Sequence, residues 1–151
     1  MKVSAQWVAH TTGKVPTQPN GKAASVADPS TWVKYSNVAQ LPRVGYVLNG
    51  AISVVDLDDC LDEAGAVSPV AAKLLSMLES DTYVEVSMSG KGLHIFGYGA
   101  LPKGKVTVID DQKVEAYSRG RYIAVTGEHH GTPVTTLSNI QPLLDYITQG
   151  G

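Results

Sequence analysis

The sequence is poor in cysteine and has no long apolar run. Cys60 is the only cysteine among 151 residues, which excludes a disulfide framework and a cysteine-rich zinc cluster. No apolar run approaches the roughly 18 residues that a membrane-spanning helix needs. The first residues, MKVSAQWVAHTTGK, lack the continuous apolar segment of a secretory signal, so we interpret them as mature sequence. We therefore expect a cytoplasmic protein with no membrane partner.

Internal repeats and low-complexity tracts are also absent from the sequence. The chain is 43% hydrophobic and has a mean hydropathy of −0.03. A chain of this length and composition can bury a sizeable core, so we predict one soluble globular domain over residues 1–151.

The charges are distributed unevenly along the chain, although the net charge is only −2. Residues 1–50 carry five lysine and arginine residues against Asp28 alone, whereas residues 51–63 carry five acids and no base. The basic residues are Lys2, Lys14, Lys22, Lys34 and Arg43, and the acids are Asp56, Asp58, Asp59, Asp62 and Glu63. This asymmetry is typical of proteins that handle a polyanion through metal ions, and ordinary solvated surface charge is the alternative.

The expected secondary structure alternates short strands with few helices. Residues 43–58 predict two strands joined by a hairpin at Asn49-Gly50, and Ser68 with Pro69 predicts the start of a helix. Further strands are expected over 82–89, 92–99, 114–117 and 121–127. Helices are expected over 28–40, 68–80 and 140–149. Residues 13–32 are rich in Gly and Pro and predict a loop. This order favours an α+β fold.

The segment SVVDLDD, residues 53–59, runs from apolar residues directly into acids. In a strand, Asp56 and Asp58 share one face and stand about 7 Å apart at the backbone, while Val55 and Leu57 occupy the other face. Neighbouring carboxylates repel each other unless a cation lies between them, and such oxygen ligands suit Mg²⁺ or Mn²⁺. The alternative is that these acids only end a strand before a loop.

The segment SMSGKGLHIFG, residues 87–97, places a glycine-rich turn between two expected strands. Glycines let backbone amides approach an anion, while Ser89 offers a hydroxyl and Lys91 a charge, so this turn could hold a phosphate. The Walker spacing is absent. His94 alternates with apolar neighbours and is expected on the open face of the sheet, although a lone histidine in a strand is more often structural.

The segment KVEAYSRGRYIAVTG, residues 113–127, contains a further acid and two arginines. Glu115 could complete the carboxylate set. Arg119 and Arg121 flank an expected tight turn, and the guanidinium of Arg121 offers a rigid fork of donors for a phosphate. Surface salt bridges are the alternative for all three residues.

The order of these segments resembles that of the archaeo-eukaryotic primase superfamily. The matching segments are VVDLDD, SGKGLHIF and VEAYSRGRYIAVTG, with DPSTW upstream. The likeness is to the bifunctional primase-polymerase domains of phages and plasmids, and it covers most of residues 10–130. It implies that Asp56, Asp58 and Glu115 are catalytic residues that bind two Mg²⁺ or Mn²⁺ ions. It implies nucleotide binding by Ser89, Lys91, His94 and Arg121 with Arg119, and weaker contacts from Lys14 and Asn20 to nucleotide or template.

The resemblance also implies an architecture and an activity. It divides the single domain into a basic N-terminal α/β lobe (1–42), an RRM-like catalytic sheet (43–130) and a C-terminal loop with a short helix (131–151). The implied reaction is template-directed nucleotidyl transfer, as a DNA polymerase, a primase or both, in the cytoplasm of a bacterial host. The implied partners are nucleoside triphosphates, a single-stranded DNA template with its primer, and a helicase or helical-bundle module in cis or in trans.

Two departures and two alternatives accompany this prediction. The chain is short for a primase-polymerase domain, no helical bundle or helicase follows the closing helix, and the sequence has the character of a domain from a longer replication protein. A metal-dependent nucleotide or nucleic-acid phosphohydrolase would keep the carboxylates and release inorganic phosphate. A non-catalytic module that binds single-stranded DNA or nucleotides would retain the acids for structure and need no divalent ion.

Overall fold

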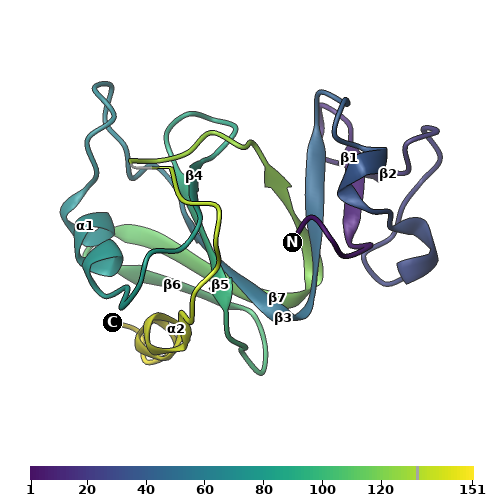
Figure 1. The fold of residues 1–151 in the computed structure, drawn as a ribbon. Helices are drawn as coiled ribbons and strands as arrows, with labels where there is room; N and C mark the ends of the chain where they lie inside the picture. Colours follow the sequence, from purple (N-terminus) through teal and green to yellow (C-terminus); the bar gives the residue numbers. More distant parts are fainter. Residues whose placement is uncertain (132) are drawn as a thin grey trace.

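The antiparallel sheet is the dominant feature of the computed structural model, which describes residues 1–131 and 133–151 (Figure 1). The strands are β1 (Trp7–His10), β2 (Pro16–Thr17), β3 (Val44–Leu57), β4 (Val84–Val86), β5 (Leu93–Tyr98), β6 (Lys105–Ile109) and β7 (Gln112–Val125). The helices are α1 (Pro69–Ser76) and α2 (Gln141–Thr148), with 3₁₀ turns η1 (Pro29–Thr31) and η2 (Tyr35–Asn37). A large antiparallel sheet with few helices confirms the α+β prediction. That the sheet has an RRM-like arrangement stays a prediction.

The two 14-residue strands β3 and β7 form the spine of the sheet. They pair with each other along both halves of their length. The first half of β3 also pairs with β1, and its second half pairs with β5, which in turn pairs with β4. The strand β6 pairs with the first half of β7. The N-terminal segment is therefore joined to the rest by one continuous sheet (Figure 1).

The hairpin predicted at Asn49-Gly50 is wrong, because β3 continues through these residues as one strand. The pairing of β3 with β7 shifts register between Leu48 and Asn49 and again between Asn49 and Val54. Gly50 has φ of 111°, and a positive φ at Gly serves a bulge as well as a turn. The turn expected around Arg119 is wrong for the same reason, since β7 also continues past Gly120 at φ of 73°.

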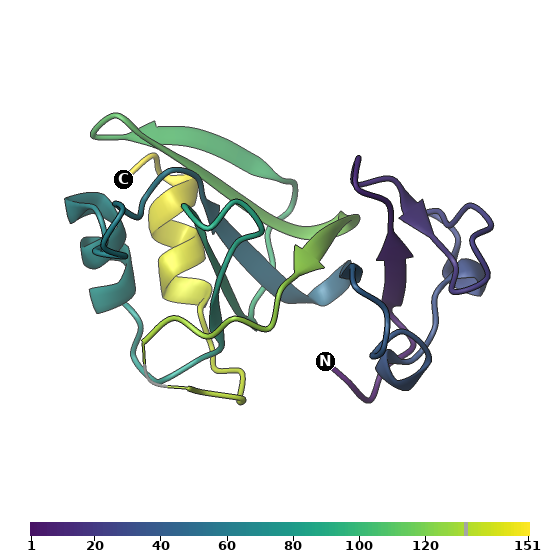
Figure 2. The ribbon, with the colours of Figure 1, turned by 90° about the horizontal axis from the view of Figure 1, so that it is seen from above.

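Both α-helices cover the apolar face of the core sheet and lie side by side (Figure 2). Val55 and Leu57 of β3 are fully buried there against Leu74 of α1 and Leu144 of α2. The predicted start of α1 is confirmed, because the Ser68 hydroxyl accepts a hydrogen bond from the backbone amide of Ala71 at 3.2 Å. With the helices on this face, the alternating residues of β3, including Asp56, are left on the opposite face.

The N-terminal segment contains strands and 3₁₀ turns, and the structure describes no α-helix within residues 1–42. Asp28 does cap a turn, since its Oδ1 accepts from the backbone amide of Ser30 at 3.0 Å. The turn ends after Thr31 because Val33 is held extended by two backbone hydrogen bonds with Trp7, each 2.8 Å long. Thus the α/β character expected for this lobe is wrong, and the division of the chain at residues 42 and 130 stays a prediction.

The two α-helices of the described residues are each 8 residues long. None of these helices combines the length and the apolarity that crossing a bilayer demands.

Candidate active site

Strand register aligns four ionisable residues in one row across the sheet. Asp56 of β3 lies opposite His94 of β5 on one side and opposite Glu115 of β7 on the other. His94 in turn lies opposite Glu85 of β4. Directly opposite residues of an antiparallel pair have Cβ atoms about 4.5–5.5 Å apart, so these side chains are immediate neighbours.

Asp56 lies at the centre of this row and is largely buried, with a side chain that is 18% exposed. Burial is the main cause that raises the pKa of Asp56 to about 6 from 3.8. The negative charges of Asp58 and Glu115 raise this pKa further, while His94 and Lys14 lower it. The surroundings of Asp56 therefore disfavour its charged form, mainly because they remove it from water.

We expect Asp56→Asn to stabilise the protein at pH 7.5 in the absence of divalent cations. The folded-state pKa of Asp56 lies above the usual value, so folding favours the protonated form and stability is lost as pH rises from about 4 to about 6. A shift of this size corresponds to roughly 1–3 kcal/mol of unfolding free energy at pH 7.5 and almost none at pH 4. Urea unfolding at both pH values with a chelator measures the difference.

The matched control for this stability prediction is Asp81→Asn, because Asp81 is exposed outside the row. The control should gain nothing between the two pH values. An equal effect of Asp56→Asn at pH 4 and at pH 7.5 would contradict the account of Asp56 as a buried, uncompensated acid.

Lys113 places its ammonium between two carboxylates of the site. Its Nζ lies 3.7 Å from Asp58 Oδ2 and 3.5 Å from Glu115 Oε1. The Asp58 side chain is 51% exposed and that of Glu115 is 16% exposed, so the Lys113 ammonium lies at the solvent edge of the row. Sequence reasoning missed Lys113, although it lies two residues before Glu115 in a strand and therefore shares its face.

The three carboxylates Asp56, Asp58 and Glu115 suit a divalent cation by their chemistry. They are hard oxygen donors on neighbouring strands, and Lys113 already balances two of them with positive charge. Across residues 1–131 and 133–151, no three His, Cys, Asp or Glu side chains are arranged as a ready set of metal ligands. The donors present thus fit Mg²⁺ or Mn²⁺, and holding the ion would require side-chain rotation and displacement of Lys113.

His94 lies on the same sheet face as Asp56, as alternation predicted, but this face is not open there, because only 5% of the surface of His94 is exposed. Its Nδ1 lies 2.8 Å from Glu85 Oε2, and its Nε2 lies 3.7 Å from Asp56 Oδ1. The rings of Phe96 and His94 are perpendicular, with centroids 6.2 Å apart. Glu85 and Phe96 therefore hold the ring on this face of the sheet, with Nε2 on the side of Asp56.

The Ser-Gly-Lys-Gly turn follows β4 and lies against the end of β3. A Cβ added at Gly92 would stand 2.6 Å from the Leu57 carbonyl oxygen, so only glycine allows this approach. The Ser89 hydroxyl accepts from the Lys91 backbone amide at 3.2 Å, and both residues are exposed. The turn is therefore brought beside the end of β3, between Asp56 and Asp58, with the Lys91 side chain exposed.

The two arginines of β7 have different surroundings. The Arg121 guanidinium lies over the Tyr117 ring, 3.9 Å from its centroid, and the Tyr117 hydroxyl donates to Glu115 Oε1 at 3.2 Å. Arg121 is thus linked to the row through one aromatic ring. Arg119 instead covers Gly50 at the bulge of β3.

The two candidates from the N-terminal loop also differ. Lys14 has a positive φ of 63°, its carbonyl accepts from the Tyr122 hydroxyl, and its charge lowers the pKa of Asp56. The structure therefore brings Lys14 towards the row. Asn20 is used within its own loop, where its Oδ1 accepts from the Lys22 backbone amide at 3.0 Å.

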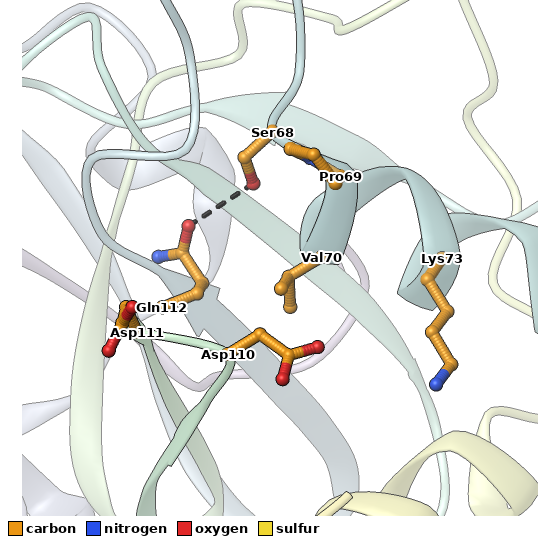
Figure 3. A pocket seen from close by; sticks show the side chains of 7 residues that line it. All are labelled: Ser68, Pro69, Val70, Lys73, Asp110, Asp111 and Gln112. Atoms are coloured by element: carbon orange, nitrogen blue, oxygen red, sulfur yellow. Dashed lines mark hydrogen bonds between the residues drawn. The ribbon is translucent and has the colours of Figure 1, made fainter.

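Two pockets flank this region. One of about 290 Å³ lies between the N-terminal segment and the glycine-rich turn and is lined by His10, Pro42, Arg43, Ser87, Met88, Gly90, Val125, Thr126 and Glu128. The other, of about 420 Å³, lies between the start of α1 and the turn that joins β6 to β7 (Figure 3). The second pocket includes none of the predicted site residues, whereas the first adjoins the turn that carries Ser89 and Lys91.

The chain is similar to a curated protein of known description. No protein-family model matches the chain. A curated protein described as DNA primase-polymerase, from Nitratiruptor phage NrS-1, is 39% identical to it over 140 aligned residues. The alignment covers 82% of this chain and 19% of the relative, so the chain spans about a fifth of the length of the protein it matches.

Proposed function

This chain belongs to the primase-polymerase family, and from that premise we propose that it catalyses template-directed nucleotidyl transfer. The observation that carries the proposal is the register that aligns Asp56, Glu115 and His94, with Asp58 beside them. The proposed substrates are nucleoside triphosphates and a primed single-stranded DNA template in phage or plasmid replication. A helicase or helical-bundle partner stays a prediction.

Asp56, Asp58 and Glu115 are the residues that would hold two Mg²⁺ or Mn²⁺ ions. When bound, such ions supply activation of a 3′-hydroxyl and charge stabilisation of the departing pyrophosphate. The raised pKa of Asp56 is consistent with this assignment, because a bound cation would stabilise the charged form that burial disfavours.

The remaining residues of the site would bind and orient the triphosphate. Lys91 and the Ser89 hydroxyl extend from a turn that glycine allows to approach the row closely. His94 would direct one ring nitrogen at the same place, and Arg121 would add a guanidinium from β7. Several fixed donors around one anion reduce the reorganisation needed during the reaction, which is the main contribution expected of the protein here.

The experiment that tests the function uses the purified chain with a primed template, labelled nucleotides and Mn²⁺ or Mg²⁺, resolved on a sequencing gel. We expect extension of the primer by residues complementary to the template, and no extension with a chelator. Release of inorganic phosphate without extension would replace the proposal by a phosphohydrolase. DNA binding that is independent of the metal, without either product, would replace it by a non-catalytic module.

The basic N-terminal segment is expected to contact the phosphates of the nucleic acid. Lys14 and Lys34 are both exposed there, so each phosphate that they neutralise adds to the counterion release on binding. We expect the affinity for a primer-template to fall steeply with salt, and Lys14→Ala or Lys34→Ala to flatten the logarithmic slope by about one unit each. Fluorescence anisotropy over a salt series measures both slopes.

Lys103→Ala is the control for this salt dependence, since Lys103 is an exposed lysine in the loop between β5 and β6. Its slope should equal that of the wild type. Binding that does not respond to salt would mean that the charge asymmetry of the sequence is incidental.

A further inference from the structure

Glu85 is a fully buried acid that the proposed chemistry does not yet use. Its Oε2 lies 2.8 Å from His94 Nδ1, and its Oε1 accepts from the Tyr83 hydroxyl at 2.6 Å. The backbone amide of Thr126 lies 3.1 Å from both oxygens, and that of Gly127 lies 3.2 Å from Oε1. Every lone-pair direction of this carboxylate is therefore directed at a hydrogen-bond partner.

These partners determine what Glu85 can do for His94. The two backbone amides are donors only, and together they occupy both carboxylate oxygens. The carboxylate thus acts as an acceptor, and His94 satisfies it by placing a proton on Nδ1. The other ring nitrogen, Nε2, is then the one that faces Asp56 at 3.7 Å.

We propose that Glu85 is a positioning residue that holds His94 with the proton on Nδ1 and Nε2 directed into the site. The role of His94 towards a nucleotide rests on the function proposed above, whereas the state of its ring can be tested without any activity. Buried polar groups that lose a partner are destabilised, so the network around Glu85 resists rotation of the ring. A histidine held by a carboxylate at one nitrogen has a defined tautomer at the other.

Glu85→Gln separates this role from a purely structural one because it keeps the shape of the side chain. Tyr83 and Gly127 donate to Oε1 alone, whereas the Thr126 amide is shared by both oxygens, so we expect the amide oxygen at the Oε1 position and the NH₂ group against His94 Nδ1. The NH₂ group of the glutamine can only donate a hydrogen bond, so His94 Nδ1 would have to accept it. The substitution should therefore remove the proton from Nδ1.

Nitrogen-15 NMR of the histidine-labelled, folded full chain without nucleotide tests this directly. We expect Nδ1 of His94 to carry a proton in the wild type and in Tyr83→Phe, which removes one partner of Glu85 without touching His94. We expect Nδ1 to lack a proton in Glu85→Gln. An unprotonated Nδ1 in the wild type, or an Nδ1 that stays protonated in Glu85→Gln, would overturn the inference whether or not the chain incorporates nucleotides.

Steady-state kinetics add a second readout. Glu85→Gln should raise the nucleotide KM by about tenfold and leave the Kd for the primer-template unchanged. In a His94→Ala background, the same change should add nothing, because Glu85 would act only through the imidazole. An equal effect of Glu85→Gln with and without His94 would overturn the positioning role and leave Glu85 as a structural link between β4 and residues 126–127.

Discussion

Replacing Asp56 or Asp58 by alanine is expected to abolish nucleotide incorporation. Each substitution removes a carboxylate that we propose to hold a metal ion, and with it several kcal/mol of charge stabilisation, so the rate of primer extension should fall by at least about 10³-fold. The fold should persist, because the loss of the buried Asp56 carboxylate removes a charged form that burial disfavours, and Asp58 is half exposed. Gel-resolved extension and thermal unfolding of the same preparations measure the two effects.

Asp81→Ala is the matched control, as an exposed aspartate that lies outside the row, and it should retain wild-type extension. In the absence of metal, Asp56→Ala should unfold at a temperature no lower than the wild type, since it relieves a buried negative charge. Incorporation at the wild-type rate by Asp56→Ala would end the interpretation of the site as a polymerase centre.

Lys91→Ala and His94→Ala are each expected to weaken nucleotide use by about 1.5–3 kcal/mol, the range of a charge-assisted hydrogen bond. The nucleotide KM should therefore rise by roughly 10–100-fold, while the affinity for the primer-template stays nearly unchanged. Lys91 projects from the exposed turn and His94 from the buried row, so they would reach the same triphosphate from two elements.

Lys103→Ala again serves as the control, because it removes an exposed lysine elsewhere and should not change the KM. His94 is buried, so its variant needs a measurement of folding alongside the kinetics. If His94→Ala unfolds and whatever folds keeps the wild-type KM, the histidine belongs to the core and its assignment to the triphosphate fails. A wild-type KM for folded Lys91→Ala would likewise remove the turn from the nucleotide site.

Local chemistry explains which elements the sequence predicted well. Ser68 followed by Pro69 starts α1 because both residues suit the first turn of any helix, whatever packs against it. Asp56 falls on the face opposite Val55 and Leu57 because alternation in a strand is a property of the backbone. The resemblance of the ordered motifs to primase-polymerases is confirmed by the phage relative.

Predictions from local sequence were wrong where the same residues suit two different backbone structures. Asn49-Gly50 suits a hairpin or a bulge equally, since both need a positive φ. A bulge forms here because β7 pairs with β3 on both sides of Asn49-Gly50. The paired residues of β7 lie about 70 residues further along the chain. The prediction of a turn near Arg119 was wrong for the same reason, because β7 pairs with β3 on both sides of this residue.

The sequence by itself determined the α+β class, the start of α1, the face of Asp56 and the resemblance to primase-polymerases. Only the tertiary structure decided that Glu85, His94, Asp56 and Glu115 form one row, because cross-strand register depends on pairing between segments distant in the chain. It likewise decided that Lys113 lies between two carboxylates and that Glu85 holds His94. A side chain's face follows from its own strand, whereas its neighbours follow from the strands that pair with it.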